Sequence, residues 1–379
     1  MPKSKETTVV LVLQGGGALG AYHVGAYQAM HEAGFAPDWV SGTSIGAITA
    51  AVVVGNPPDE RVERLEELWE EISRPDSWGA WLPPQLLRAF NTTSALEALA
   101  VGQPNFFIPN FPSPYFSVPG SASATAFYDT TPMRATLRRL CDFDLINRGP
   151  TRISLGATNV RTGDLTYFDN RKSKKPIGPE HVLASGSLPP GFPATEVEGE
   201  YFWDGGCISN TPLHAVIDDP PPGHTLVFMV DLWGAAGEVP QTIDEVIWRQ
   251  KQIQYASRTT HHIDTVAARL NLRSRLARLR DKLPKPALDD PAVQDSMDLA
   301  YDGTMDILHI QYTPTPDQVS SSDAEFSRPS IARRSAAGYE DMKTAIGQAP
   351  WRAKERPPQA ATVVHRYAAG RVLQRVPRT

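Results

Sequence analysis

The sequence predicts an α/β fold in which a mainly parallel central sheet is covered by helices on both faces, giving three layers. Two observations predict this fold. Strand patterns alternate with helical patterns along the chain. The strand patterns are continuous apolar runs, which are typical of parallel strands buried on both faces. At 379 residues and 41% hydrophobic content, the chain is long enough to bury a large core.

The first two strand–helix units have the clearest patterns. Residues 8–14 form an apolar, β-branched run, followed by the glycine-rich sequence GGGALG and by a helical pattern that ends at Gly34. A second strand is expected over 37–42 and a helix of small residues over 44–55. An exposed helix should follow over 59–73.

Residues 73–128 have a different composition, rich in proline, aromatic and small residues without clear periodicity. We expect an insertion packed over the core, either as a lid, as the wall of an apolar pocket, or only as packing. Its aromatic residues are candidates for an acyl-binding groove: Phe106, Phe107, Phe111, Tyr115 and Phe116.

Sheet and helix patterns resume after this segment. Thr131 is the expected cap of a helix with Pro132 in its first turn. Strands over 151–160 and 164–170 should form a hairpin, because a short RTG turn separates them. Further buried strands are expected over 225–233 and 305–314.

Charge divides the chain into an acidic body and two basic segments. The net charge is −5. Residues 249–285 nevertheless contain ten Arg and Lys residues and only two acidic residues, and residues 352–379 contain seven Arg and Lys residues and one acidic residue. A basic amphipathic helix over 245–285 could lie on an anionic membrane surface or pack on the body. We expect a main domain over 1–315 and a C-terminal extension over 316–379 that ends in a loosely ordered basic tail.

The GGGALG sequence permits two interpretations. Gly15, Gly17 and Gly20 fit the dinucleotide-binding template, with Asp38 as the ribose ligand. A glycine loop before a helix also offers unpaired N–H groups, which can hold a phosphate or the oxyanion of acyl transfer.

The second strand favours acyl transfer, because it runs into Gly42-Thr43-Ser44-Ile45-Gly46. This G-x-S-x-G pattern is typical of a nucleophile at a sharp strand-to-helix turn, which needs small neighbours. Ser44 is therefore the candidate nucleophile, with Gly42 and Gly46 as the residues that allow the turn.

A serine nucleophile needs a base, and none of the nine histidines has a recognisable local context. The better candidate is Asp204, which ends a short apolar run and precedes Gly205 and Gly206. Two glycines allow a tight turn and a close approach to a neighbouring element. No cluster of residues has metal-ligand spacing, and no cofactor is expected.

Together these motifs resemble the patatin-like phospholipase family. The resemblance rests on GGGALG (15–20), GTSIG (42–46), ASGSLPPGFP (184–193) and DGG (204–206), in the family's order. Residues 323–342 resemble an extension found on many bacterial members. The resemblance implies a Ser44–Asp204 dyad without histidine or calcium. It also implies an oxyanion hole formed by the N–H groups of Gly15, Gly16, Gly17 and Ala18.

One departure concerns Leu19, which stands where the family often has Arg or Lys. The implied function is hydrolysis of lipid acyl esters through an acyl-serine, of the phospholipase A, lysophospholipase or esterase type. An acyltransferase or thioesterase on the same scaffold, and more remotely a nucleotide-binding module, remain alternatives. The expected partners are a lipid or acyl-ester substrate and an anionic membrane surface, without nucleic acid; the oligomeric state is open.

The expected location is the cytoplasm, with peripheral contact to a membrane. Two cysteines provide no disulfide framework, which suits a reducing compartment. The apolar run near the N-terminus is too short for a secretory signal.

Overall fold

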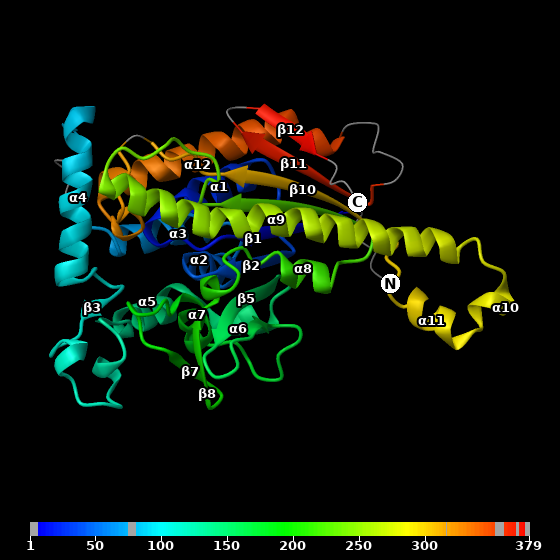
Figure 1. The fold of residues 1–379 in the computed structure, drawn as a ribbon, viewed down its shortest axis with the longest axis horizontal. Helices are drawn as coiled ribbons and strands as arrows, with labels where there is room; N and C mark the ends of the chain where they lie inside the picture. Colours follow the sequence, from blue (N-terminus) through cyan, green and yellow to red (C-terminus); the bar gives the residue numbers. More distant parts are fainter. Residues whose placement is uncertain (1–6, 75–80, 316, 353–359, 369–370, 376–379) are drawn as a thin grey trace.

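A computed structural model describes residues 7–74, 81–315, 317–352, 360–368 and 371–375 (Figure 1). Within these ranges ten strands form a central sheet in the order β12-β11-β10-β9-β1-β2-β5-β8-β7, and β6 pairs with β5 outside this path. Neighbouring strands from β11 to β5 are parallel. The remaining pairings are antiparallel. The predicted α/β fold with a mainly parallel central sheet is confirmed.

The strands span Thr7–Leu13 (β1), Trp39–Thr43 (β2), Ile108–Pro109 (β3), Tyr128–Asp129 (β4), Arg152–Asn159 (β5), Leu165–Asp169 (β6), Thr195–Val197 (β7), Glu200–Asp204 (β8), His224–Asp231 (β9), Thr304–Gln311 (β10), Thr362–Ala368 (β11) and Arg371–Arg375 (β12). The helices span Ala21–Glu32 (α1), Ile45–Val54 (α2), Arg61–Glu71 (α3), Pro84–Val101 (α4), Thr131–Leu140 (α5), Phe143–Arg148 (α6), Pro179–Gly186 (α7), His214–Asp218 (α8), Ile243–Arg280 (α9), Lys285–Leu288 (α10), Pro291–Met297 (α11) and Arg328–Gln348 (α12).

Each face of the sheet is covered by a different set of helices. In β1 the side chains of Val9, Leu11 and Leu13 belong to a core shared with α1, α2, α3 and α12. Val10 and Val12 belong to a second core shared with α8 and α9. Alternate residues of a strand point to opposite faces, so a sheet covered on both faces requires a continuous apolar run.

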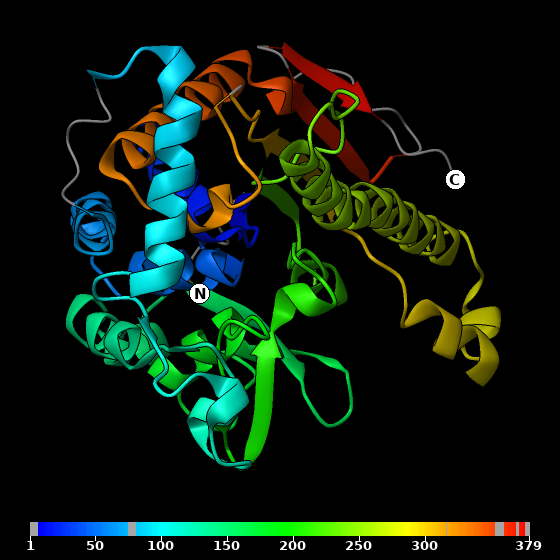
Figure 2. The same ribbon diagram turned by 60° about the vertical axis from the view of Figure 1, so that its left-hand side comes forward.

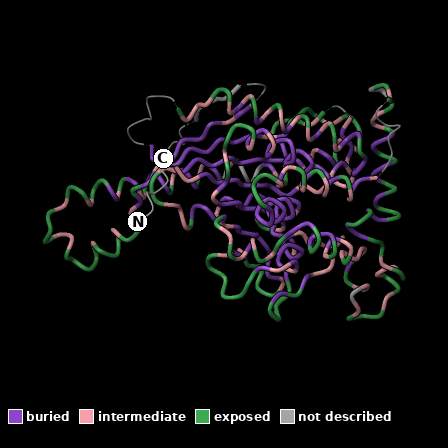
Figure 3. The backbone as a smooth tube through the Cα atoms, turned by 180° about the vertical axis from the view of Figure 1, so that it is seen from behind, coloured by how far each residue is buried: buried purple, intermediate pink, exposed green. Residues whose placement is uncertain are grey.

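The long helix α9 corresponds to the predicted basic helix over 245–285, and it crosses in front of the sheet in Figure 1. It continues into α10 and α11, which project from the body and are mostly exposed (Figure 3). Although α9 has 38 residues, no helix among those described is both long and apolar enough to cross a bilayer.

The C-terminal residues form part of the central sheet. β11 pairs in parallel with β10, and β12 pairs with β11. The expectation of a loosely ordered basic tail is therefore wrong for residues 362–368 and 371–375. Hydrogen bonds along a neighbouring strand hold these residues despite their basic composition. The sheet thus continues across the predicted domain boundary at residue 315.

The proline- and aromatic-rich segment contains a helix, α4, that its sequence pattern did not predict. The buried face of α4 consists of Phe90, Asn91, Ser94, Ala95 and Ala98. A stripe with a single large apolar residue gives a weak helical pattern, which explains why the helix was missed.

The hairpin and the helix cap after this segment agree with the sequence, apart from a shift of one residue. β5 and β6 pair antiparallel across a turn in which Gly163 has a φ of 76°. Helix α5 begins at Thr131, and the capping position is Thr130. Asp129 Oδ1 accepts the Thr131 N–H at 2.8 Å.

Two glycines let α1 and α12 pack backbone against backbone. A Cβ atom added at Gly25 would lie 1.8 Å from the Ser335 carbonyl oxygen. A Cβ at Gly338 would lie 2.1 Å from the Tyr22 carbonyl oxygen. The C-terminal helix is therefore seated on α1 without room for a single added carbon.

We predict that Gly338→Ala destabilises the protein by about 1–3 kcal/mol, because overpacking forces α12 away from α1. Gly347→Ala in the same helix is the control, since a Cβ there meets nothing within 4 Å. Urea unfolding of both variants measures the difference. Equal midpoints for the two variants would contradict the close packing.

Candidate active site

The predicted site residues meet at the carboxyl ends of the strands. Leu13 of β1 lies opposite Gly42 of β2 in a parallel pair, so the turns after both strands emerge at the same edge of the sheet. β8 pairs with β5 and adds Asp204 at its end. A pocket of about 260 Å³ is lined by Ser44, Asp204 and residues 15–17.

Ser44 occupies the sharp turn between β2 and α2. Its backbone has a φ of 57° and a ψ of −127°, a conformation that side-chain-bearing residues rarely adopt. Such strain costs of order 1–3 kcal/mol and persists only where the surroundings impose it. The Ser44 N–H donates to the Ser185 carbonyl oxygen at 3.0 Å. The side chain is half-buried at the N-terminus of α2, where the helix dipole favours negative charge.

Gly42 and Gly46 flank Ser44 at positions where no side chain fits. A Cβ at Gly42 would lie 2.2 Å from the Gly46 carbonyl oxygen, and a Cβ at Gly46 would lie 2.3 Å from the Leu13 carbonyl oxygen. The turn is therefore packed against its own helix and against β1.

Asp204 is a buried carboxylate beside the serine. Its Oδ1 accepts the Gly206 N–H at 2.7 Å. Its Oδ2 is buried and makes no hydrogen bond of standard geometry with the described residues. Burial raises the pKa of Asp204 to about 6, although the nearby Ser44 hydroxyl and the Gly206 N–H each lower it.

The glycines of the DGG motif allow this turn to approach its neighbours. A Cβ at Gly205 would lie 2.5 Å from the Gly156 carbonyl oxygen of β5. A Cβ at Gly206 would lie 2.9 Å from Asn210 Oδ1 and 3.0 Å from Asp204 Oδ1. Larger residues at either position would displace the carboxylate.

The glycine loop after β1 supplies N–H groups, with one change from the prediction. The Gly15 N–H donates to the Asn210 carbonyl oxygen at 3.1 Å, so Gly15 is not available as an oxyanion donor. The N–H groups of Gly16, Gly17 and Ala18 make no hydrogen bond with the part of the chain that the structure describes. Gly17 has a φ of 54°, which turns the loop into a short 3-10 helix before α1.

Three residues that the sequence reasoning did not single out hold this loop. The Gly15 carbonyl oxygen accepts bonds from Asn210 Nδ2 and Trp233 Nε1, both at 2.8 Å. Gln14 Oε1 accepts the Leu232 N–H at 2.6 Å. Gln14 directly precedes the three glycines, and Asn210 follows DGG by four residues. The position of Gln14 and Asn210 beside the motifs is the sequence signal that could have identified these two residues.

The ASGSLPPGFP stretch connects the serine and the aspartate. Ser185 accepts the Ser44 N–H through its carbonyl oxygen, and its Oγ donates to the Gly156 carbonyl oxygen at 2.6 Å. The Ser187 carbonyl oxygen accepts the Asp204 N–H at 3.0 Å. One segment at the end of α7 therefore positions both candidate catalytic residues.

The C-terminal part of the chain closes the pocket over the glycine loop. Asp323 lines the pocket. A Cβ added at Gly17 would lie only 2.2 Å from the Asp323 carbonyl oxygen. Lys251 Nζ donates to both carboxylate oxygens of Asp323, at 2.8 and 2.9 Å. The buried Arg334 guanidinium donates to the Ala18 carbonyl oxygen at 3.1 Å and to the Glu325 carbonyl oxygen at 2.9 Å.

The aromatic insertion contributes to the pocket only in part. Phe106 and Phe107 line it, as expected for an acyl groove. Phe111, Tyr115 and Phe116 do not line it, and their side chains are 97%, 82% and 83% exposed. The expectation that all five aromatic residues form the groove is therefore wrong for these three.

The competing candidates from the sequence lie elsewhere. No histidine of the described residues lines the pocket. His309 is buried in β10 against Asp231, at 2.6 Å. Asp38, the candidate ribose ligand, precedes β2 and therefore lies at the opposite end of this strand from Ser44; its Oδ2 accepts the Val9 N–H. Among the residues that the structure describes, no cluster of His, Cys, Asp or Glu could hold a metal ion.

A serine at a strand–turn–helix elbow lies beside a buried carboxylate and a glycine loop in which the N–H groups of Gly16, Gly17 and Ala18 are free of bonds to the described residues, as in α/β proteins that carry the G-x-S-x-G pattern. A family model described as patatin-like phospholipase matches residues 11–217, more than half of the chain. The chain therefore belongs to the patatin-like phospholipase family. A second model, described as patatin phospholipase, matches residues 253–358.

Individual relatives match shorter regions. The chain is 46% identical over 59 residues to patatin-like phospholipase domain-containing protein ZK370.4 of Caenorhabditis elegans. It is 31% identical over 125 residues to patatin-like phospholipase domain-containing protein 6 of Homo sapiens. These matches cover 16% and 31% of this chain but only 4% and 9% of the two relatives.

Two solved structures are similar over 90% of this chain. VipD from Legionella pneumophila has 16% identity and a TM-score of 0.38, with 67% of that chain covered. The type III effector protein ExoU has 14% identity and a TM-score of 0.33, with 53% of that chain covered.

We predict that Asp204→Asn stabilises the protein at pH 7.5 by roughly 2–3 kcal/mol, since the pKa of Asp204 is raised from 3.8 to about 6. A carboxyl with a raised pKa favours folding below pH 3.8, and this contribution is lost as the pH rises through 6. The gain in stability should therefore disappear in acid. Urea unfolding from pH 3.5 to 8 tests this, and a gain independent of pH would contradict it.

Proposed function

We propose that this protein is a lipid acyl hydrolase in which Ser44 is the nucleophile and Asp204 is the base. The observation that carries the proposal is the arrangement of Asp204, a buried carboxylate near the Ser44 hydroxyl, whose Oδ2 makes no hydrogen bond of standard geometry with the described residues. A pKa of about 6 makes this carboxylate a stronger base than an ordinary aspartate, and leaves it ionised at neutral pH.

In the proposed reaction, Asp204 takes the hydroxyl proton of Ser44 while Ser44 Oγ attacks the carbonyl carbon of an ester. The carbonyl oxygen becomes an oxyanion, which accepts hydrogen bonds from the N–H groups of Gly16, Gly17 and Ala18. Each such donor contributes about 3–4 kcal/mol of transition-state stabilisation. The tetrahedral intermediate expels the alcohol, which takes the proton from Asp204, and water then hydrolyses the acyl-serine with Asp204 again as base.

The pocket supports a fatty acyl chain as the group that is transferred. Beyond the polar catalytic groups, its wall is formed by apolar side chains: Ile45, Ile48, Leu99, Phe106, Phe107 and Phe326. An acyl ester of a phospholipid, a lysophospholipid or another lipid is therefore the proposed substrate. Transfer of the acyl group to an alcohol other than water would use the same acyl-serine.

We predict that Ser44→Ala lowers kcat/KM for p-nitrophenyl butyrate and for phosphatidylcholine by about 10³-fold or more, because the covalent route is lost. A fluorophosphonate probe should label the wild type and not this variant. Ser209→Ala, which removes a half-buried serine outside the proposed machinery, is the control and should keep both properties. Continued labelling of Ser44→Ala would refute the assignment of the nucleophile.

We also predict that kcat/KM for p-nitrophenyl butyrate rises tenfold per pH unit below pH 6 and is constant above it. The base acts only when deprotonated, and the pKa of Asp204 is about 6. Product should be quantified by chromatography after quenching, from pH 4.5 to 8.5. A plateau that already begins near pH 4 would indicate an ordinary, exposed carboxylate as the base.

A further inference from the structure

Exposed apolar side chains are concentrated at the end of the molecule where the pocket lies. Of the 21 large apolar side chains that are exposed in the described residues, ten fall within residues 81–118. The most exposed of these ten are Phe111, Trp81, Phe116, Tyr115 and Val118, at 97%, 88%, 83%, 82% and 76%. Single exposed apolar residues are ordinary on protein surfaces, whereas such a concentration marks an interaction site.

The second part of the segment that carries these side chains is uncharged. Residues 98–128 contain no Asp, Glu, Lys or Arg. A partner recognised through charge therefore has nothing to bind here, whereas the hydrocarbon boundary of a lipid layer accepts aromatic and aliphatic side chains.

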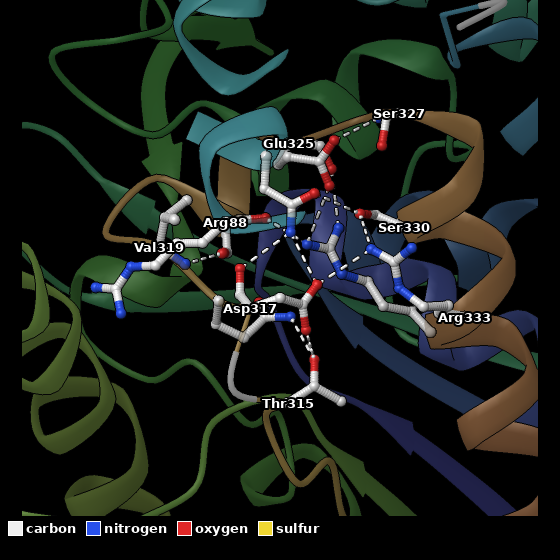
Figure 4. A network of polar contacts seen from close by, with 12 residues as sticks. Arg88, Thr315, Asp317, Val319, Glu325, Ser327, Ser330 and Arg333 are labelled. Atoms are coloured by element: carbon white, nitrogen blue, oxygen red, sulfur yellow. Dashed lines mark hydrogen bonds and ion pairs between the residues drawn. The ribbon is translucent and has the colours of Figure 1, made fainter. Parts of the chain in front are cut away.

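α4 is held firmly, so its outer apolar face is not the result of loose packing. On the inner face, Asn91 Nδ2 donates to the Asp317 carbonyl oxygen at 3.0 Å and to its carboxylate at 2.9 Å. Figure 4 shows Asp317 within a network of polar contacts. Arg88 pairs with Asp244 at 2.9 Å and with Glu245 at 3.1 Å, at the start of α9. The outer face carries exposed side chains that include Leu86, Leu96 and Leu99.

The same face is continuous with the pocket. Leu99 and Leu188 both line the pocket and are 38% and 37% exposed. The Tyr128 hydroxyl donates to the Leu99 carbonyl oxygen at 2.7 Å, and the Tyr128 N–H donates to the Gly191 carbonyl oxygen at 2.9 Å. In Figures 1 and 2, α4 and the loop after it lie together at one end of the molecule. An acyl chain can thus pass from this face into the pocket along apolar side chains.

We propose that α4 and residues 102–118, here called the apolar face, dock on the surface of a lipid layer and lead the acyl chain into the pocket. This proposal rests on the function proposed above. It replaces the expectation from the sequence that the basic amphipathic helix over 245–285 (α9) is the surface that contacts a membrane. There, Arg273 and Arg280 donate to the Leu299 carbonyl oxygen and to Asp302, so both are engaged within the protein. Docking should therefore need neither anionic lipid nor low salt.

The test is flotation of the full chain with vesicles of zwitterionic phosphatidylcholine, in the Ser44→Ala background so that no lipid is consumed. The double variant Phe111→Ser/Phe116→Ser should reduce vesicle binding at least about tenfold, because two exposed aromatic anchors are lost. Leu272→Ser/Leu279→Ser on α9 is the matched control, with side chains 58% and 49% exposed, and should bind like the parent. Binding should persist in 0.5 M NaCl.

With Ser44 restored, Phe111→Ser/Phe116→Ser should hydrolyse p-nitrophenyl butyrate in solution at the wild-type rate, and lose activity only on vesicles. This result separates docking from chemistry, because failure of the proposed function would abolish both activities. The docking proposal is overturned if the double variant binds vesicles like the parent, or if binding needs anionic lipid and is lost in salt. It is also overturned if light scattering shows that the apolar face joins two copies of the chain and neither binds vesicles.

Discussion

Backbone contact between the turns that follow β1 and β2 is the constraint on which the site depends. Gly46 packs on the carbonyl group of Leu13, and a Cβ at Gly15 would lie 2.9 Å from the Cβ of Ser44. Any side chain at these positions would force the two turns apart. The strained conformation of Ser44 is therefore held by the sheet itself.

The C-terminal region completes the site rather than being appended to it. α12 is seated on α1 through Gly25 and Gly338, and it brings Arg334 to the carbonyl group of Ala18. Arg334 is buried with Glu325, 3.6 Å away, so its charge is compensated. A cation is thus present at the glycine loop although Leu19 occupies the position where the family often has Arg or Lys. The second family match, over 253–358, covers this region.

The sequence predicted the parts of the molecule whose local pattern and tertiary role agree. The buried strands, the turn at Ser44 and the DGG turn have residue patterns that few other structures tolerate. It did not predict α4, because the buried stripe of this helix contains alanine, serine and asparagine. Nor did it separate Phe106 and Phe107, which line the pocket, from Phe111 and Phe116, which are exposed; all four are aromatic residues in one irregular segment.

The sequence by itself determined the α/β fold, the elbow at Ser44 and the carboxylate of Asp204 as a candidate base, because glycine spacing and apolar runs act over a few residues. Only the tertiary structure decided which groups are free to act. The Gly15 N–H is occupied by Asn210, 195 residues away, whereas the N–H groups of Gly16 and Gly17 are open. Burial, which raises the pKa of Asp204, likewise comes from elements distant in sequence. Hydrogen-bond satisfaction and desolvation are properties of the packed molecule, so no local pattern encodes them.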